Sequence, residues 1–206
     1  MTDHRFSPED KDRIAAAIAQ AESATAGEIY VVVAHTVDDI RYIPVIWAAC
    51  AALVLPWPLY LLTNLSTTMI LVLQAVVFVG ATLFMALPSI QHHVVPNAIA
   101  AEHTRRQAYE QFLAHGVHLT EARTGVLIYV TPRARRVEIV ADVGIHSKVG
   151  QAAWEELAQE ISGAARNGQL VEGMLNAIRK AGALLARHFP PSARNPNELS
   201  DRMVEI

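Results

Sequence analysis

Three aspartates occupy positions from which a carboxylate could support metal-dependent chemistry. Asp142 follows a run of β-branched residues at a turn, and α/β sheets place ligand-binding groups at such strand ends. Asp38 and Asp39 follow an earlier apolar run, and adjacent carboxylates offer oxygen atoms to a hard cation such as calcium or magnesium. We therefore take Asp38, Asp39 and Asp142 as candidate metal ligands, and Asp142 as a candidate catalytic carboxylate. The alternatives are an aspartate bonded to the backbone of its own turn and solvated loop acids.

The sequence contains none of the common catalytic signatures around these acids. The phosphate loop G-x-x-x-x-G-K-[ST], the nucleophile elbow G-x-S-x-G and the zinc motif H-E-x-x-H are all missing. The single cysteine, Cys50, lies in an apolar block, so it forms no intrachain disulfide. A hydrolase would therefore depend on metal-assisted chemistry at carboxylates, and the lack of a convincing nucleophile counts against catalysis.

Charge is distributed unevenly along the 206 residues. The chain has 17 basic and 20 acidic residues, and none of them lies between Tyr42 and Ala101. Elsewhere about one residue in four is charged, the usual share for a soluble domain. This pattern indicates one soluble domain with one apolar segment, and excludes a disordered chain and a polytopic transporter. The net charge of −3 has no long run of one sign, so we expect no nucleic-acid partner.

The apolar block contains two stretches of bilayer length. Residues 42–62 would form a helix about 31 Å long, and residues 69–87 form a second span with Gln74 as its polar intruder. The short polar link at 63–68 permits a tight reversal, so we predict a two-helix transmembrane hairpin over 42–88. Pro56 and Pro58 predict a kink in the first span. The alternative is an apolar hairpin buried inside a soluble protein.

Basic residues near the predicted spans indicate an orientation. The link carries no lysine or arginine, whereas Arg41, Arg105 and Arg106 lie on the other side, which by the positive-inside rule puts the soluble domain in the cytoplasm. The polar start of the chain has no signal-peptide pattern. We therefore expect a multi-pass protein of the inner (plasma) membrane, whose partners are the lipid bilayer and other membrane proteins or a second copy.

The charged regions contain helix and strand patterns in α/β order. Ser7 and Pro8 are typical of a helix start, and the apolar spacing that follows supports a helix. The turn between the last two predicted strands favours a hairpin, so the sheet is mixed. The predicted strands are 28–34, 125–130 and 137–141, and helices are expected from residue 8, at 97–115 and on both sides of Asn167-Gly168.

These patterns predict a three-layer α/β/α sandwich with helices on both sheet faces. The domain has two parts, residues 1–41 and 89–190, because the transmembrane hairpin at 42–88 interrupts it. Both faces of the 28–34 strand are apolar, so we expect it to be central in the sheet. Residues 191–206 contain prolines and no apolar period, which predicts a flexible tail.

Three ordered motifs carry a resemblance to a known family. They are TAGEIYVVV at 25–33, RTGVLIYV at 123–130 and RVEIVADVGI at 136–145. Together with the helix order, they resemble the TPM domain family, in its subgroup of bacterial membrane proteins with an inserted transmembrane hairpin. Glu28 matches the family motif, and we expect a structural role for it in the turn after the first helix.

The resemblance implies an α/β/α sandwich. For relatives in the family, acid phosphatase activity, calcium binding, and roles in photosystem repair or receptor assembly have been proposed. Exported relatives tend to have a glycine-aromatic-glycine turn after the third strand, followed by an acid. Here the turn is Ala141–Gly144, and residues 146–150 contain no acid.

The expected function is a cytoplasmic TPM-like domain, held at the membrane by its hairpin, that acts in protein interaction or the assembly of a membrane complex. The alternative implied by the resemblance is a membrane-anchored, metal-dependent acid phosphatase. That enzyme would use Asp142 with Asp38 or Asp39, and calcium or magnesium.

Overall fold

The computed structural model describes residues 6–35, 42–87, 90, 95–132, 134–191 and 197–206. The chain forms two compact units. One comprises Met1–Val37 and Ala101–Ile206, and the other is Asp38–Ala100. We refer to them as the α/β unit and the apolar unit.

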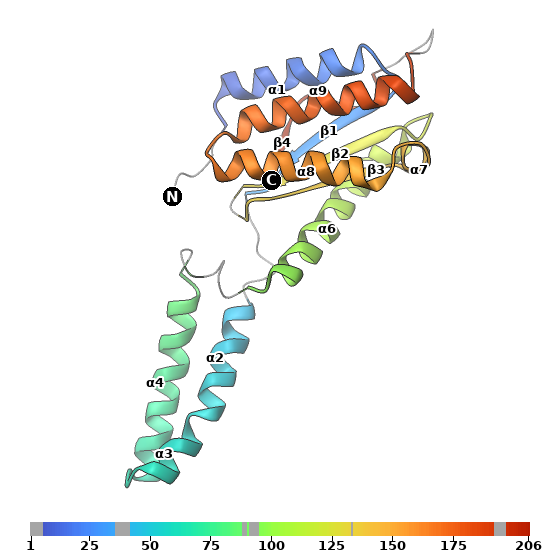
Figure 1. Ribbon diagram of the computed structural model, residues 1–206. Coiled ribbons are helices and arrows are strands. Elements are labelled where there is room, and N and C mark those ends of the chain that lie inside the picture. Colours follow the sequence, from blue (N-terminus) through green and yellow to red (C-terminus); the bar gives the residue numbers. More distant parts are fainter. Residues whose placement is uncertain (1–5, 36–41, 88–89, 91–94, 133, 192–196) are drawn as a thin grey trace. The chain divides into compact units, whose positions relative to one another are not determined.

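The α/β unit is built on a mixed four-stranded sheet (Figure 1). The strand order is β3-β2-β1-β4, with β1 parallel to β2 and to β4, and with β2 antiparallel to β3. The β2–β3 hairpin and the mixed sheet confirm the sequence prediction. The strands are β1 (Glu28–Val33), β2 (Gly125–Thr131), β3 (Arg136–Ala141) and β4 (Val204–Glu205).

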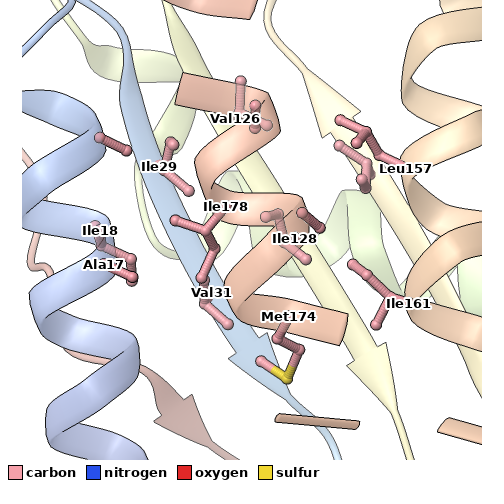
Figure 2. Packing of buried hydrophobic residues seen from close by; sticks show 14 of the residues in the cluster. Ala17, Ile18, Ile29, Val31, Val126, Ile128, Leu157, Ile161, Met174 and Ile178 are labelled. Atoms are coloured by element: carbon pink, nitrogen blue, oxygen red, sulfur yellow. The ribbon is translucent and has the colours of Figure 1, made fainter. Parts of the chain in front are cut away.

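Alternate side chains of β1 enter two separate apolar clusters, one on each face of the sheet. Ile29, Val31 and Val33 pack with helices α1, α8 and α9, whereas Tyr30 and Val32 pack with α6 and the short helix η2. Figure 2 shows Met174 and Ile178 of α9 against strand residues on the first face. The α/β class is thus confirmed. The helices are α1 (Pro8–Glu22), α6 (Asn97–Ala114), η2 (Val117–Leu119), α7 (Val143–His146), α8 (Gln151–Arg166) and α9 (Leu170–His188).

Helix α1 begins where the sequence predicts. The Ser7 hydroxyl accepts a hydrogen bond from the backbone N–H of Asp10 at 3.1 Å, and the Asp10 carboxylate accepts one from the backbone N–H of Ser7 at 3.2 Å. This reciprocal capping satisfies two N–H groups that the helix itself leaves free. Pro8 occupies the first turn, where a missing N–H costs nothing.

The prediction of a flexible tail is wrong for residues 197–206. Val204 pairs with Val32 in β4, and the backbone N–H of Ile206 donates to the Val33 carbonyl at 3.0 Å. Leu199 and Val204 pack against the second apolar cluster. Because a two-residue strand buries few side chains, this segment shows no regular spacing of apolar residues from which a strand could be predicted. The pairing with β4 also makes β1 a central strand, because β4 lies along the edge of β1 that is not paired with β2.

The apolar unit consists of helices that pack against one another. They are α2 (Tyr42–Val54), α3 (Pro56–Leu62) and α4 (Thr67–Met85), and α4 contacts both of the others. The predicted first span is divided at Leu55, because Pro56 begins a new helix. Ser66 caps α4 by accepting a hydrogen bond from the backbone N–H of Met69, so that helix starts two residues before the predicted span. Tyr42–Leu62 and Thr67–Met85 are long and apolar enough to cross a membrane.

Candidate functional site

Asp142 lies at the end of β3, as predicted, and caps the short helix α7. Its Oδ1 atom accepts a hydrogen bond from the backbone N–H of Val143 at 2.6 Å, and its side chain is 3% exposed. This arrangement agrees with the alternative given above, an aspartate that is bonded to the backbone of its own turn. The role of Asp142 as a catalytic residue or metal ligand stays a prediction.

An arginine is the charged neighbour of Asp142. The Nη1 atom of Arg123 lies 3.9 Å from Asp142 Oδ2, which has no hydrogen-bond partner in the part of the chain that the structure describes. Arg123 has a φ of 54°, and its Nη1 atom donates to the His118 carbonyl at 2.6 Å. Gly144 is required here, because a Cβ atom at that position would lie 2.5 Å from the Arg123 carbonyl oxygen. The loop before β2 and the turn after β3 are therefore packed closely together.

Calcium and magnesium do not fit the described surroundings of Asp142. These ions take six or more oxygen ligands, whereas one carboxylate oxygen is available here and a guanidinium group lies beside it. Among the described residues, no group of three or more histidine, cysteine, aspartate or glutamate side chains could hold a metal ion. Asp38 and Asp39 lie outside the described residues.

A second group of acids lies at the other end of the sheet, and we call it the carboxyl cluster. It consists of Glu22 at the end of α1, Glu28 at the start of β1, and Glu198 and Asp201 from the C-terminal segment. Glu22 Oε1 accepts a hydrogen bond from the Ile29 N–H at 2.8 Å, and Glu28 Oε2 accepts one from the Leu199 N–H at 3.2 Å. These bonds join α1, β1 and the C-terminal segment.

Burial changes the protonation of this cluster. It raises the pKa of Glu22 from 4.5 to about 8, against the effect of the Ile29 N–H, and the negative charges of Glu28 and Asp201 and a hydrogen bond with Asp201 add to the rise. Burial also raises the pKa of Glu28, against the backbone N–H groups of Leu199 and Glu198. Glu22 and Glu28 are 8% and 4% exposed. Because a substrate could scarcely reach them, we assign these two acids a structural role.

Sequence reasoning identified Glu28 as a structural residue and missed the rest of the cluster. A signal for Glu22 was present, since Ile14, Ile18 and Glu22 recur every four residues on the buried face of α1. An acid that continues an apolar helix face predicts a buried carboxyl group. The approach of Glu198 and Asp201 had no such signal, because it depends on the tertiary path of the C-terminal segment.

The fold and these residues define a small α/β domain interrupted by an apolar helical unit. Within this chain, residues 89–184 match the model of the TPM domain, so the protein contains a TPM domain. The matched region holds β2 and β3, whereas the central strand β1 precedes the apolar unit.

The fold also resembles a solved structure. The NMR structure of the BA42 protein from the psychrophilic bacterium Bizionia argentinensis is similar with a TM-score of 0.63 and 19% sequence identity, over 100% of this chain and 99% of that chain. At this identity the likeness concerns the fold alone. No curated protein matches the sequence.

The raised pKa of Glu22 predicts a pH-dependent stability. The folded chain holds this proton to a higher pH than the unfolded chain, so the free energy of unfolding falls as the pH rises from about 4.5 to about 8. Glu22→Gln keeps an acceptor for the Ile29 N–H and removes the titration. We expect this variant to raise the Tm by several degrees at pH 8 and to change it little at pH 4.5. Thermal melts across this range measure the effect.

The matched control is Glu156→Gln, which removes an exposed acid from α8. It should leave the pH profile of the Tm unchanged. A Glu22→Gln profile that runs parallel to that of the unmodified chain would contradict the buried, protonated carboxyl group.

The capping role of Asp142 predicts a graded loss of stability. Asp142→Ala leaves the Val143 N–H without its acceptor and should lower the free energy of unfolding by about 1 kcal/mol, the usual cost of losing a helix N-cap. Asp142→Asn keeps an oxygen acceptor and should cost less. Urea titration measures both values. A rise in Tm on adding calcium that Asp142→Asn abolishes would instead establish a metal ligand.

Proposed function

We propose that the protein is anchored in the inner membrane by its apolar unit and that its TPM domain acts in protein interaction or the assembly of a membrane complex. The observation that carries the proposal is the outward exposure of apolar side chains on α2, α3 and α4. Large exposed residues on these helices include Leu53, Trp57, Tyr60, Leu61, Leu62, Leu71, Val76, Leu83 and Phe84.

The exposure argues against a buried soluble hairpin. In the most apolar stretches of the two spans, 11% and 6% of the residues are buried. A core helix of a soluble protein would be mostly buried, and an apolar surface of this extent in water would favour aggregation. A bilayer removes the same surface from water and matches the lengths of both spans.

Hydroxyl groups on and beside the two spans bond to the backbone of their own helices. The hydroxyl group of Thr82, on the second span, donates to the Phe78 carbonyl, and that of Thr63, just after the first span, donates to the Leu59 carbonyl. Because of these bonds, neither hydroxyl group is left with an unsatisfied donor in an apolar medium. Trp47 lies in the first half of α2 and Trp57 at the start of α3, so indole rings are available near both ends of the first span.

The orientation that we propose places the TPM domain in the cytoplasm. The described arginines of α6, Arg105 and Arg106, follow the second span in the sequence, and the link between α3 and α4 contains no basic residue. The positive-inside rule favours this arrangement. The chain is then a multi-pass membrane protein with both parts of its soluble domain on one side.

An exposed apolar strip on α6 and η2 supports an interaction role for the domain. Tyr109 and Leu113 are one helical turn apart and are 48% and 58% exposed, and Leu119 on η2 is 70% exposed. Exposed aromatic and aliphatic side chains at helical spacing are typical of protein-binding surfaces. The partner that we propose is another membrane protein or a second copy of the chain.

Membrane anchoring predicts that charge in the middle of the spans prevents insertion. Leu53→Arg and Val76→Arg place arginines on exposed faces of both spans, where each costs about 3 kcal/mol of insertion free energy. We expect the unmodified chain to stay in the membrane fraction after alkaline washing, and the double variant to be released. Tyr109→Arg, on an exposed face of α6, is the matched control and should remain in the membrane.

Fusions after Ile206 measure the orientation in the same strain. A fluorescent protein that folds in the cytoplasm should be bright, and a phosphatase that is active in the periplasm should be inactive. Release of the unmodified chain by alkaline washing would refute the anchor, and an active periplasmic fusion would reverse the orientation.

The interaction role predicts a covalent crosslink from the α6 strip. A photoreactive amino acid in place of Leu113 should yield a larger, protein-containing adduct when cells are irradiated. The same amino acid in place of the exposed Arg187 on α9 is the control and should give none. Identical patterns from the two positions would refute an interaction surface on α6. An adduct of twice the mass of the chain identifies a second copy as the partner.

A further inference from the structure

One end of the sheet in the α/β unit carries the turn between β2 and β3, and we call it the turn end. Val33, the last residue of β1, pairs in parallel with Val130, and Thr131 pairs with Arg136 across the turn. The carboxyl ends of β1 and β2 therefore lie at the same end as the turn. The chain leaves β1 at this end, and α2 begins nine residues after Val33 in the sequence.

Helix α6 brings its first half to the same end. The Tyr129 hydroxyl donates to Gln107 at 3.2 Å, and the Tyr30 hydroxyl lies 3.2 Å from His115 Nδ1. Tyr30 is level with Leu127 in the sheet register, so Tyr129 is two residues nearer to the turn end. Helix α6 thus runs from the turn end toward the opposite end, with Arg105 and Arg106 at its middle, next to Gln107.

The turn end is rich in arginine. Arg135 is exposed and has a φ of 52°, Arg136 is half-buried at the start of β3, and Arg105 and Arg106 are exposed on α6. The acids near these groups are Glu138, whose pKa burial raises and Arg105 lowers, together with Glu155 on α8 and with Glu102 and Glu110 on α6. Glu110 is paired with Arg106 at 3.0 Å. The described residues of the β2–β3 turn itself carry no acid.

The opposite end of the sheet carries acids of both buried and exposed kinds, together with Arg123 before β2 and Lys148 over the Phe189 ring. Glu22, Glu28, Glu198 and Asp201 form the carboxyl cluster there, and Glu198 also accepts hydrogen bonds from the Glu121 N–H. Glu205 of β4 lies level with Val33, toward the turn end, and is paired with Lys11 at 3.0 Å. The turn end also receives the start of α1, with Glu9 and Asp10, because Lys11 pairs with Glu205 and Arg13 pairs with Glu172 at the start of α9. The arginine-rich surface is therefore the part formed by the β2–β3 turn and α6, and an anionic surface would attract that part.

We propose that the turn end binds the surface of an anionic bilayer, with Arg135, Arg136 and Arg105 contacting the phosphate oxygens of acidic lipid headgroups. The inference rests on the proposed membrane anchor, which keeps the domain near a bilayer surface. A guanidinium group binds phosphate oxygens through two parallel N–H donors. Basic residues close to an anionic leaflet are attracted within about one Debye length, roughly 8 Å at physiological salt.

The test uses the full chain in lipid nanodiscs. A donor fluorophore is attached at Ala134→Cys in a Cys50→Ser background, and acceptor dyes are carried by a fraction of the lipid headgroups. Discs contain either phosphatidylcholine alone or phosphatidylcholine with phosphatidylglycerol. We expect energy transfer to be at least twofold greater in the anionic discs and to fall to the neutral level in 0.5 M salt.

Charge variants identify the arginines. Arg135→Gln with Arg136→Gln should reduce energy transfer in anionic discs to the neutral level, whereas Arg135→Lys with Arg136→Lys should retain most of it. The matched control is Arg179→Gln with Arg187→Gln, which removes two exposed arginines from α9 and should change nothing. Circular dichroism verifies that each variant is folded.

Equal energy transfer in neutral and anionic discs, or an unchanged value in the Arg135→Gln and Arg136→Gln variant, would overturn this inference and leave the anchor intact. A chain that does not enter discs of either composition would overturn the anchor as well. Binding that inorganic phosphate at 10 mM abolishes at constant ionic strength would assign the arginines to a soluble anion and would also overturn the bilayer contact.

Discussion

The fold depends on the pairing of β1 on both sides. This strand is buried along its whole length, and its backbone groups are shared between β2, which follows the apolar unit in the sequence, and β4, which is formed by the last residues. Its side chains supply both apolar clusters of the α/β unit. The strand is thus stable only when β1, β2 and β4, which are distant in the sequence, pair with one another. The long apolar insertion between β1 and β2 must therefore allow these two strands to lie side by side.

Local patterns were sufficient to predict most of the elements. The cap at Ser7, the β-branched strands and the breaks at proline gave the helices and strands of the α/β unit to within a few residues, because each pattern reports the environment of one segment. The C-terminal strand was not predictable in this way. It has one paired valine and no period, and its position is determined by the edge of β1 that it covers.

The candidate site shows the same division. The position of Asp142 at a strand end followed from sequence, but its hydrogen bond to Val143 and its neighbour Arg123 depend on a loop packed from another part of the chain. The carboxyl cluster was missed because two of its four acids come from the C-terminal segment. Sequence patterns thus locate an acidic side chain, whereas tertiary packing determines whether it meets an arginine or another carboxyl group.

The order of the strands along the sequence sets an order of events during synthesis. Residues 42–85 are synthesised before any of β2, β3 and β4, so β1 has no partner strand while the apolar helices are being made. The sheet is complete only after β4 has been synthesised. Helix α1 and β1 must therefore wait, with their apolar faces uncovered, until the rest of the domain has been translated.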